Sequence, residues 1–334
     1  MGFLSERNPI AKISIVSSVG LGLIAISVFF IPDQITDLLE KAGVKDQVRP
    51  LYRSLVYSTL SIAGRNPMCH SDEVKAAILS VARIARTFKE KRVEESQDMV
   101  LYEDPHGAFW IPSKAEVGGF HIMMAEGLAD IYHFKSENLK DAVVLDCGAN
   151  VGSFTRTALK AGARKVIAIE PAPDLVRCLR RTFAKEITEG RVVVYPKGVW
   201  NTNATLDLYT SDTPWTNSVV PLVESANAQK KVSVQLVAID ELVPELGLER
   251  VDFIKMDIEG AETNALAGAS QTIARYKPVL AVATEHTTDI LKNTQAVIDV
   301  VDKEAPGYTH TCISCMWQER VPSLILPEIV LFRR

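Results

Sequence analysis

The sequence has no excess of basic residues and contains few cysteines. Its 334 residues include 37 Lys and Arg against 41 Asp and Glu, a formal net charge of -4. It therefore lacks the basic excess with which nucleic-acid-binding domains neutralise phosphate, and we expect no nucleic-acid partner. The five cysteines are odd in number and scattered, which favours a reducing compartment over a disulfide framework. With 47% hydrophobic residues and no internal repeat, the chain is typical of a globular domain with an extension.

Charged residues are absent from Ile13 to Ile31. About 19 residues at about 1.5 Å each reach roughly 28 Å, close to the hydrocarbon thickness of a bilayer. This predicts one membrane-spanning helix within an N-terminal segment of residues 1–32. A buried helix or a signal peptide is the alternative, because serines and glycines dilute the hydrophobicity. Against a cleaved signal, the run ends without a small-residue cleavage site. The basic residues on its two sides do not fix its orientation.

Residues 33–135 are predicted to form a helical connecting segment that carries a β-hairpin. Ser71 can cap a helix whose apolar residues recur at three- and four-residue steps as far as Phe88. Between Met99 and Pro112, two short apolar runs flank Asp-Pro-His-Gly, a pattern that is typical of a hairpin.

From residue 136 to residue 334, short runs rich in β-branched residues alternate with helical patterns. Five main strands are predicted, at Ala142–Asp146, Lys165–Glu170, Arg191–Tyr195, Val251–Asp257 and Pro278–Thr284. Helical patterns follow the first, second, fourth and fifth, which predicts an α/β fold with a parallel sheet covered on both faces. Further strands are expected at Ala204–Tyr209 and Lys231–Val237. Two last runs, Tyr308–Ile313 and Leu324–Phe332, have no helix between them and must be antiparallel to each other.

A glycine-containing loop follows the first main strand. It reads Asp-Cys-Gly-Ala-Asn-Val-Gly from Asp146 to Gly152, at the place where open α/β sheets bind ligands. Dinucleotide-binding loops have the spacing G-x-G-x-x-G, whose middle glycine lets phosphate approach the backbone. Here Asn150 stands between Gly148 and Gly152. Asparagine can adopt the left-handed conformation, but its side chain would obstruct a phosphate pressed against the loop.

The charge of Asp146 favours a cationic ligand. Two unit charges about 4 Å apart interact by roughly 4 kcal/mol at an effective dielectric near 20, so this carboxylate would oppose a pyrophosphate. S-adenosylmethionine carries an ammonium and a sulfonium and no phosphate, and its carboxylate could use the free N–H groups near Ser153 and Phe154. Glu170, at the end of the second strand, is placed to accept hydrogen bonds from both ribose hydroxyls, as an acid also does in NAD sites. S-adenosylmethionine is the predicted cofactor, and a nicotinamide-dependent oxidoreductase is the alternative.

Four segments resemble the FkbM family of S-adenosylmethionine-dependent methyltransferases. They are VVLDCGANVGSFTRTAL at Val143–Leu159, IAIEPAP at Ile167–Pro173, LVAIDEL at Leu236–Leu242 and VDFIKMDIEGAETNALAGA at Val251–Ala269. The resemblance covers roughly residues 109–334, and the combination of the first, second and fourth motifs is strongly specific. It implies a class I methyltransferase fold, a Rossmann-like parallel sheet of seven strands with the last strand antiparallel. It also implies methyl transfer, usually O-methylation of a small molecule or a sugar.

The resemblance assigns cofactor contacts residue by residue. The glycine loop would form the methionine side of the pocket and Glu170 the ribose end. The segment after the third strand would form the adenine edge, although it lacks the acid or amide that many methyltransferases have there. The expected cofactor-binding residues are Asp146, Gly148, Asn150, Gly152, Glu170, Gly198, Val199, Trp200 and Asp257.

Candidate catalytic residues follow the fourth and fifth main strands. A hydroxyl acceptor needs a base to take its proton, and such a base must lie at the carboxyl ends of the central strands. We expect Asp257 to orient the cofactor or the acceptor, and His286 or Glu285 to act as the base. Together with Glu259 these residues could instead bind a divalent cation through hard oxygen ligands and one imidazole, although no metal is predicted. Asn217, with its neighbours Thr216 and Ser218, is expected to line the acceptor site.

A second cluster of possible ligands lies near the C-terminus. His310, Cys312 and Cys315 could supply three zinc ligands, with Cys69 or His70 as a fourth, but a single C-x-x-C pair is weak evidence and reduced thiols are the favoured interpretation.

Taken together, the sequence predicts a single-pass membrane protein whose methyltransferase domain lies in the cytoplasm, where the cofactor is made. Its expected acceptor is a small molecule or a lipid-linked compound, and its oligomeric state is open. A non-catalytic scaffold that keeps the fold is the second alternative.

Overall fold

The computed structural model describes residues 81–334 except 82, 86, 89–90, 97, 105–106, 116, 211–216, 221–229, 288 and 318–324. The predicted membrane-spanning run Ile13–Ile31 and most of the helix predicted from Ser71 lie outside the described residues and stay predictions. Among the helices that the structure does describe, none is long and apolar enough to cross a membrane. The fold below is that of the compact unit Met68–Met316 with Leu326–Arg334.

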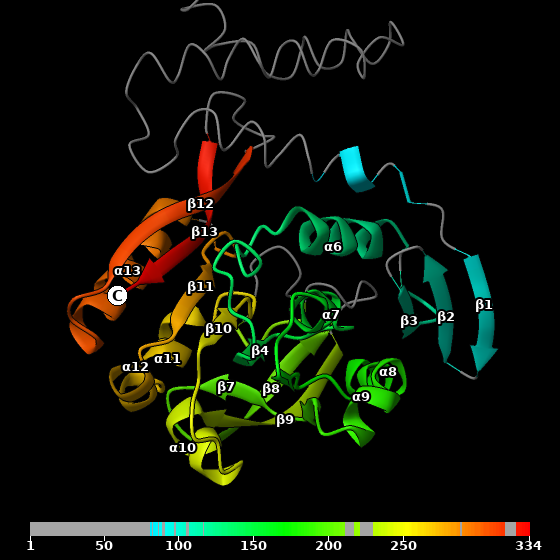
Figure 1. The fold of residues 1–334 in the computed structure, drawn as a ribbon, viewed down its shortest axis with the longest axis horizontal. Helices are drawn as coiled ribbons and strands as arrows, with labels where there is room; N and C mark the ends of the chain where they lie inside the picture. Colours follow the sequence, from blue (N-terminus) through cyan, green and yellow to red (C-terminus); the bar gives the residue numbers. More distant parts are fainter. Residues whose placement is uncertain are drawn as a thin grey trace, which may run out of the picture. The chain divides into compact units, whose positions relative to one another are not determined.

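A seven-stranded sheet forms the centre of this unit (Figure 1). Its strands lie in the order β12 (Thr309–Trp317), β13 (Ile325–Arg333), β11 (Val279–Ala283), β10 (Phe253–Met256), β4 (Val143–Cys147), β5 (Lys165–Ile169) and β6 (Val192–Tyr195). The strands β11, β10, β4, β5 and β6 run parallel, and β13 is antiparallel to β11. The predicted parallel sheet with an antiparallel last strand is confirmed.

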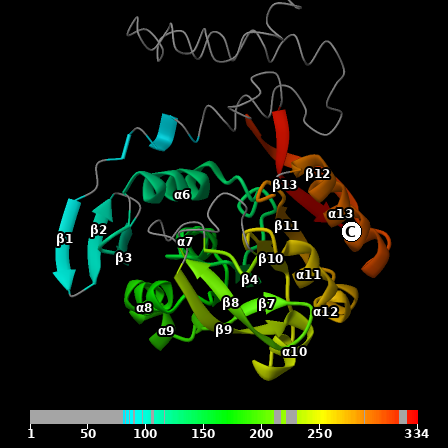
Figure 2. The same cartoon turned by 180° about the vertical axis from the view of Figure 1, so that it is seen from behind.

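Helices connect the parallel strands on both faces of the sheet. They are α7 (Ser153–Lys160), α8 (Pro173–Thr182), α9 (Ala184–Thr188), α11 (Glu262–Ala267), α12 (Ser270–Tyr276) and α13 (Ile290–Glu304). The strands β4, β5 and β6 progress toward one edge and β10 and β11 toward the other. Right-handed crossovers therefore place α7 to α9 and α11 to α13 on opposite faces, as Figures 1 and 2 show. The direction reverses between β4 and β10, so ligands are expected at the carboxyl ends of these strands.

Two small sheets flank the central one. The first contains β7 (Gly198–Trp200), β9 (Lys230–Ala238) and β8 (Ala204–Thr210) in that order, and α10 (Ile239–Glu245) follows β9. The segment Gly198–Trp200, expected only as a ligand edge, is thus a short strand parallel to β9. The second sheet contains β1 (Lys91–Ser96), β2 (Met99–Asp104) and β3 (Gly107–Pro112). The predicted hairpin β2–β3 is confirmed, whereas β1 was not predicted because its sequence KRVEES is polar and exposed.

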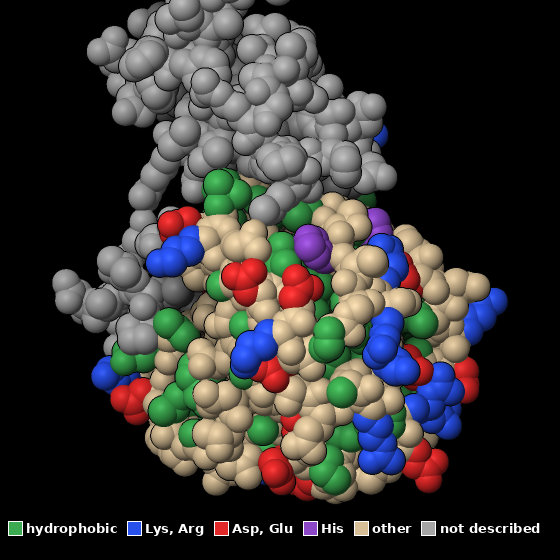
Figure 3. Space-filling view, turned by 90° about the vertical axis from the view of Figure 1, so that its left-hand side faces the viewer, with side chains coloured by type: hydrophobic (Ala, Val, Ile, Leu, Met, Phe, Trp, Pro, Cys, Tyr) green, Lys and Arg blue, Asp and Glu red, His purple; other side chains and the backbone are tan. Residues whose placement is uncertain are grey.

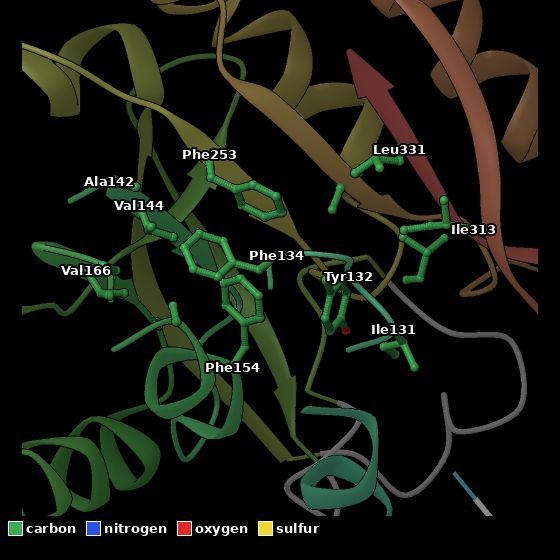
Figure 4. Close-up of a cluster of buried hydrophobic side chains, with 14 of the residues drawn as sticks. Ile131, Tyr132, Phe134, Ala142, Val144, Phe154, Val166, Phe253, Ile313 and Leu331 are labelled. Carbon is green, nitrogen blue, oxygen red and sulfur yellow. The ribbon is translucent and has the colours of Figure 1, made fainter. Parts of the chain in front are cut away.

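The segment before residue 136 packs on the central sheet. After β3, α6 (Val117–Ala129) leads to a loop whose ring of Phe134 lies between Phe154 and Phe253, at centroid distances of 6.0 and 5.1 Å. Figure 4 shows these three rings in contact, with Tyr132 beside them. Phe134 is fully buried, and truncating a buried Phe to Ala typically costs about 3–5 kcal/mol. The domain boundary at residue 136 stays a prediction, but residues on its N-terminal side belong to the core that holds the site.

Candidate active site

The loop after β4 is tight because three of its residues adopt left-handed backbone conformations. The φ angles are 78° at Gly148, 52° at Asn150 and 94° at Gly152, and asparagine is one of the few other residues that tolerates this region. A Cβ atom on Gly148 would lie 1.9 Å from the carbonyl oxygen of Asp257. The missing side chain of Gly148 therefore lets the loop after β4 touch the loop after β10, which joins the two strand ends at the switch point.

Glu170, directly after β5, braces this loop from the next strand. Its Oε2 accepts a hydrogen bond from the N–H of Asn150 and its Oε1 one from the N–H of Ala172, both at 2.9 Å. Burial raises the pKa of Glu170 to about 7, and the two N–H donors oppose that rise. Each carboxylate oxygen has two lone-pair sites, so both oxygens can still accept from a ligand hydroxyl.

Asp146 does not lie at the mouth of the site as an unpaired charge. Its side chain is fully buried and accepts a hydrogen bond from Thr155 Oγ1 at 2.6 Å. The ammonium of Lys255, on β10, lies 3.5 Å from Asp146 Oδ1 and 3.5 Å from Asp257 Oδ2. Burial raises the pKa of Asp146, and Lys255 opposes this. The electrostatic argument made from the sequence counted this carboxylate without its cation, so the field at the site must come from other acids.

Asp257 is the centre of a hydrogen-bonded cluster directly after β10. Its Oδ2 accepts from the hydroxyl of Tyr132 at 2.7 Å, and its Oδ1 lies 2.8 Å from Nε2 of His286. The other ring nitrogen of His286 lies 3.3 Å from Glu259 Oε2, and Nε2 also lies 3.4 Å from Glu285 Oε1. The ends of β10 and β11 therefore bring together Asp257, Glu285 and His286, the three predicted catalytic residues.

The groups of this cluster have strongly shifted pKa values. Burial would raise the pKa of Asp257, but Lys255, His286 and Tyr132 outweigh it, and the pKa is well below its ordinary range. Burial raises the pKa of Glu285 to about 8 and that of Glu259 to about 7, although His286 opposes both shifts. Burial lowers the pKa of His286, but the surrounding carboxylates raise it by more, so the pKa lies well above its ordinary value. Asp257 is thus a permanent anion, whereas Glu285 changes charge near neutral pH.

One cavity of about 210 Å³ joins the glycine loop to this cluster. The predicted site residues that line it are Gly148, Asn150, Glu170, Gly198, Val199, Asp257, Glu285 and His286. Asp146, Gly152 and Trp200 are not among its lining residues, and Trp200 packs against an apolar cluster. The role of each of these residues in binding a cofactor stays a prediction.

Two buried amide oxygens give the cavity an unmet hydrogen-bonding capacity. Asn150 Oδ1 and Asn217 Oδ1 have no hydrogen-bond partner in the part of the chain that is described, and both residues line the cavity. Buried polar atoms are rarely left without a partner in native proteins, so these atoms indicate a polar ligand. Ser218 donates to the carbonyl oxygen of Glu259 at 2.6 Å and fixes this wall, whereas Thr216 lies outside the described residues.

Four ionisable lining residues were not assigned from the sequence. Lys255 lies in the motif Val251–Ala269, which gave it no role, and Glu328 lies in a run that was expected only to form a strand, β13. Glu126 and Tyr132 precede the predicted domain boundary. Only the Lys255 motif gave a usable signal, because a lysine two residues before a strand-end aspartate points to the same side of the strand.

His310, Cys312 and Cys315 do not act together as zinc ligands, and Cys69 and His70 lie outside the described residues. Cys315 is disulfide-bonded, so it has no thiolate to offer, and the expectation of a reduced thiol is wrong at this position. Cys312 is a free, buried thiol whose pKa burial raises to about 11, and His310 is exposed beside the ring of Phe332. Within the described ranges, metal-ligand spacing occurs at Asp257, Glu285 and His286, whose ligand atoms lie within 4.8 Å of one another.

Comparisons with known proteins agree on one family. Residues 146–305 match the model of the methyltransferase FkbM domain. The chain is 30% identical over 156 residues to methyltransferase sdnD of Sordaria araneosa, and the match covers 38% of this chain and 60% of that protein. It is 25% identical over 151 residues to 2-O-methyltransferase NoeI of Sinorhizobium fredii, and the match covers 41% of this chain and 61% of that protein. The chain thus spans about 60% of the length of these relatives.

A solved structure of methyltransferase FkbM from Methylobacillus flagellatus KT is also similar. It is 16% identical, with a TM-score of 0.42, and the match covers 78% of this chain and 60% of that one.

Proposed function

The chain carries a methyltransferase FkbM domain, as its motifs predict, and we propose that it transfers the methyl group of S-adenosylmethionine to a hydroxyl group of a small-molecule, sugar or lipid-linked acceptor. The observation that carries the proposal is the convergence of Glu170 and Asp257, from two strand ends, on one cavity beside the glycine loop. A hydroxyl acceptor is supported by the relative whose name describes it as a 2-O-methyltransferase.

The cavity has groups that fit each part of S-adenosylmethionine. Glu170 would accept hydrogen bonds from the ribose hydroxyls, and Asn150 Oδ1 would accept from the ligand's ammonium. The first N–H groups of α7, at Ser153 and Phe154, have no partner within the helix and would bind the carboxylate. Gly198 and Val199 would pack against the adenine. The bound cofactor supplies an electrophilic methyl group, and the chain supplies alignment and the exclusion of water.

Glu285 is the group best suited to take the acceptor's proton. A general base works best when its pKa lies near the operating pH, because it is then both ionised and basic. The pKa of Glu285 is about 8, whereas Asp257 is too weak a base and His286 is already protonated at neutral pH. Asp257 would orient the acceptor hydroxyl, and His286 would stabilise the charges of both carboxylates.

Ligand binding and methyl transfer test this proposal separately. Calorimetry should show binding of S-adenosylhomocysteine and no binding of NAD, and binding of NAD alone would establish the oxidoreductase alternative. Cell extracts should then contain an acceptor that takes labelled methyl from S-adenosylmethionine in the presence of the protein and not of its Asp257→Asn variant. Binding of S-adenosylhomocysteine without any transfer would favour the non-catalytic scaffold.

The proposal includes a membrane anchor at Ile13–Ile31 with the catalytic domain on the cytoplasmic side. The disulfide at Cys315 is more typical of an oxidising compartment, so sidedness needs its own test. In intact cells, external protease should leave a cytoplasmic domain intact and should digest an external one.

No nucleic-acid partner is proposed. On the face drawn in Figure 3, acidic side chains lie next to the basic ones, which gives no continuous basic surface there.

A further inference from the structure

Two carboxylates of the cavity have no part in the proposed reaction. Glu126 lies on α6 and Glu328 on β13, two elements that are far apart in the sequence, yet both line the same cavity as Asp257 and Glu285. Neither belongs to the glycine loop or to the strand ends that hold the cofactor and the base. Their position on the wall beside the catalytic cluster is where an acceptor would lie.

The cavity contains more negative than positive groups. Its acidic lining residues are Glu126, Glu170, Asp257, Glu259, Glu285 and Glu328, and its basic ones are Lys255 and His286. Both basic groups already have partners. The ammonium of Lys255 donates to the carbonyl oxygens of Gly148 at 2.7 Å and Cys147 at 3.3 Å and lies 3.5 Å from Asp257. His286 lies between Asp257, Glu259 and Glu285.

Within the described ranges, neither Glu126 nor Glu328 forms an ion pair with a basic side chain. The carboxylate of Glu328 accepts a hydrogen bond from Ser314 Oγ at 2.5 Å. The carboxylate of Glu126 has no hydrogen bond or ion pair to any residue in the part of the chain that the structure describes. Both line the same cavity, and the charge of Glu328 adds to the rise that burial causes in the pKa of Glu126. Burial raises the pKa of both groups, so each favours its neutral form in the empty cavity and would ionise when a positively charged ligand binds beside it.

We propose that Glu126 and Glu328 form a binding site for an ammonium group of the acceptor, so that the acceptor is an amine that also carries the hydroxyl to be methylated. Only the identity of the methylated group rests on the proposed function. We take the occupant to be an organic cation, since the described group of three ligands with metal-ligand spacing is Asp257, Glu285 and His286 and does not include these two residues. An ammonium donates up to three hydrogen bonds, which suits two carboxylates from different elements.

The first test uses the charge of the natural acceptor. A cell extract is passed over a cation exchanger at pH 7, and each fraction is assayed with labelled S-adenosylmethionine and the full-length protein. The methyl acceptor should be retained by the exchanger and should lose activity after acetylation of its amine. The Glu126→Gln and Glu328→Gln variants should lower kcat/KM by about 10- to 100-fold, the loss expected for one charge-assisted hydrogen bond. The exposed Glu249→Gln variant is the matched control and should behave as the wild type.

Transfer to an acceptor in the unretained, neutral fraction would overturn this inference while leaving the proposed function intact. Absence of transfer from every fraction would refute the proposed function alone, so a second test does not depend on turnover. Ethanolamine hydrochloride should raise the melting temperature of the full-length protein more than ethylene glycol does at equal ionic strength. The Glu126→Gln/Glu328→Gln double variant should lose this difference and should still bind S-adenosylhomocysteine. Equal effects of the two probes, or stoichiometric binding of Mg²⁺ that Glu126→Gln abolishes, would overturn the ammonium site.

Discussion

Replacing Lys255 with Met should destabilise the protein strongly, because it leaves two carboxylates without their cation. Lys255 is almost fully buried, and its ammonium lies 3.5 Å from both Asp146 and Asp257. Removing one partner of a buried ion pair typically costs about 3–5 kcal/mol, since an uncompensated charge remains in the interior. The variant also loses the hydrogen bond to the carbonyl oxygen of Gly148 at 2.7 Å. Denaturant unfolding at pH 7 should show a midpoint far below that of the wild type.

An exposed ion pair with the same separation provides the control. Lys231 lies 3.5 Å from Asp207, but both side chains are more than half exposed, and such pairs contribute little to stability. Lys231→Met should therefore unfold close to the wild type. Asp146→Asn in the Lys255→Met background should restore part of the lost stability, because it removes the stranded charge. If Lys255→Met unfolds at the same denaturant concentration as Lys231→Met, burial does not strengthen this pair and the electrostatic description of the site is wrong.

Three further outcomes are expected. Gly148→Ala should unfold at a lower denaturant concentration than Gly190→Ala: both glycines have positive φ, but only a Cβ on Gly148 meets the carbonyl of Asp257. The pKa of Glu285 is raised from 4.5 to about 8, so the folded state holds that proton more tightly. Stability should fall as pH rises between these values, by up to about 5 kcal/mol, and pH-dependent unfolding of Glu285→Gln should be flatter. Leu23→Arg should move the full-length protein from the membrane to the soluble fraction after carbonate extraction, since a central Arg costs about 2.5–3.5 kcal/mol in a spanning helix.

The fold was largely predictable because hydrophobic patterning is a local signal. Buried parallel strands read as short continuous apolar runs, and the runs before Asp146 and Asp257 became β4 and β10. The missed strand β1 has a polar, exposed sequence and forms by pairing with β2. Its formation depends on a neighbouring strand and not on its own residues.

The site was predictable where one motif fixes both position and conformation. Asn150 adopts the left-handed conformation expected of it, and Glu170 reaches the same loop from the next strand. Burial and partners were not readable from the motif, since they depend on what the fold brings alongside. Asp146 looked like a free charge because Lys255, 109 positions later, becomes its neighbour only after β4 and β10 pair. Glu126 and Glu328 were missed for the same reason.

The sequence argument attributed the exclusion of phosphate to Asp146, whereas the structure makes other carboxylates responsible for it. Lys255 compensates Asp146, so the carboxylate ahead of the first glycine cannot repel a pyrophosphate as the sequence argument required. The walls of the cavity instead carry Asp257, which is itself paired with Lys255 and His286, together with Glu126 and Glu328, whose pKa values burial raises. A diphosphate entering there would oppose the ionisation of Glu126 and Glu328, whereas a sulfonium or an ammonium beside them would favour it. We therefore expect the cavity to favour a cationic donor and a cationic acceptor over a diphosphate.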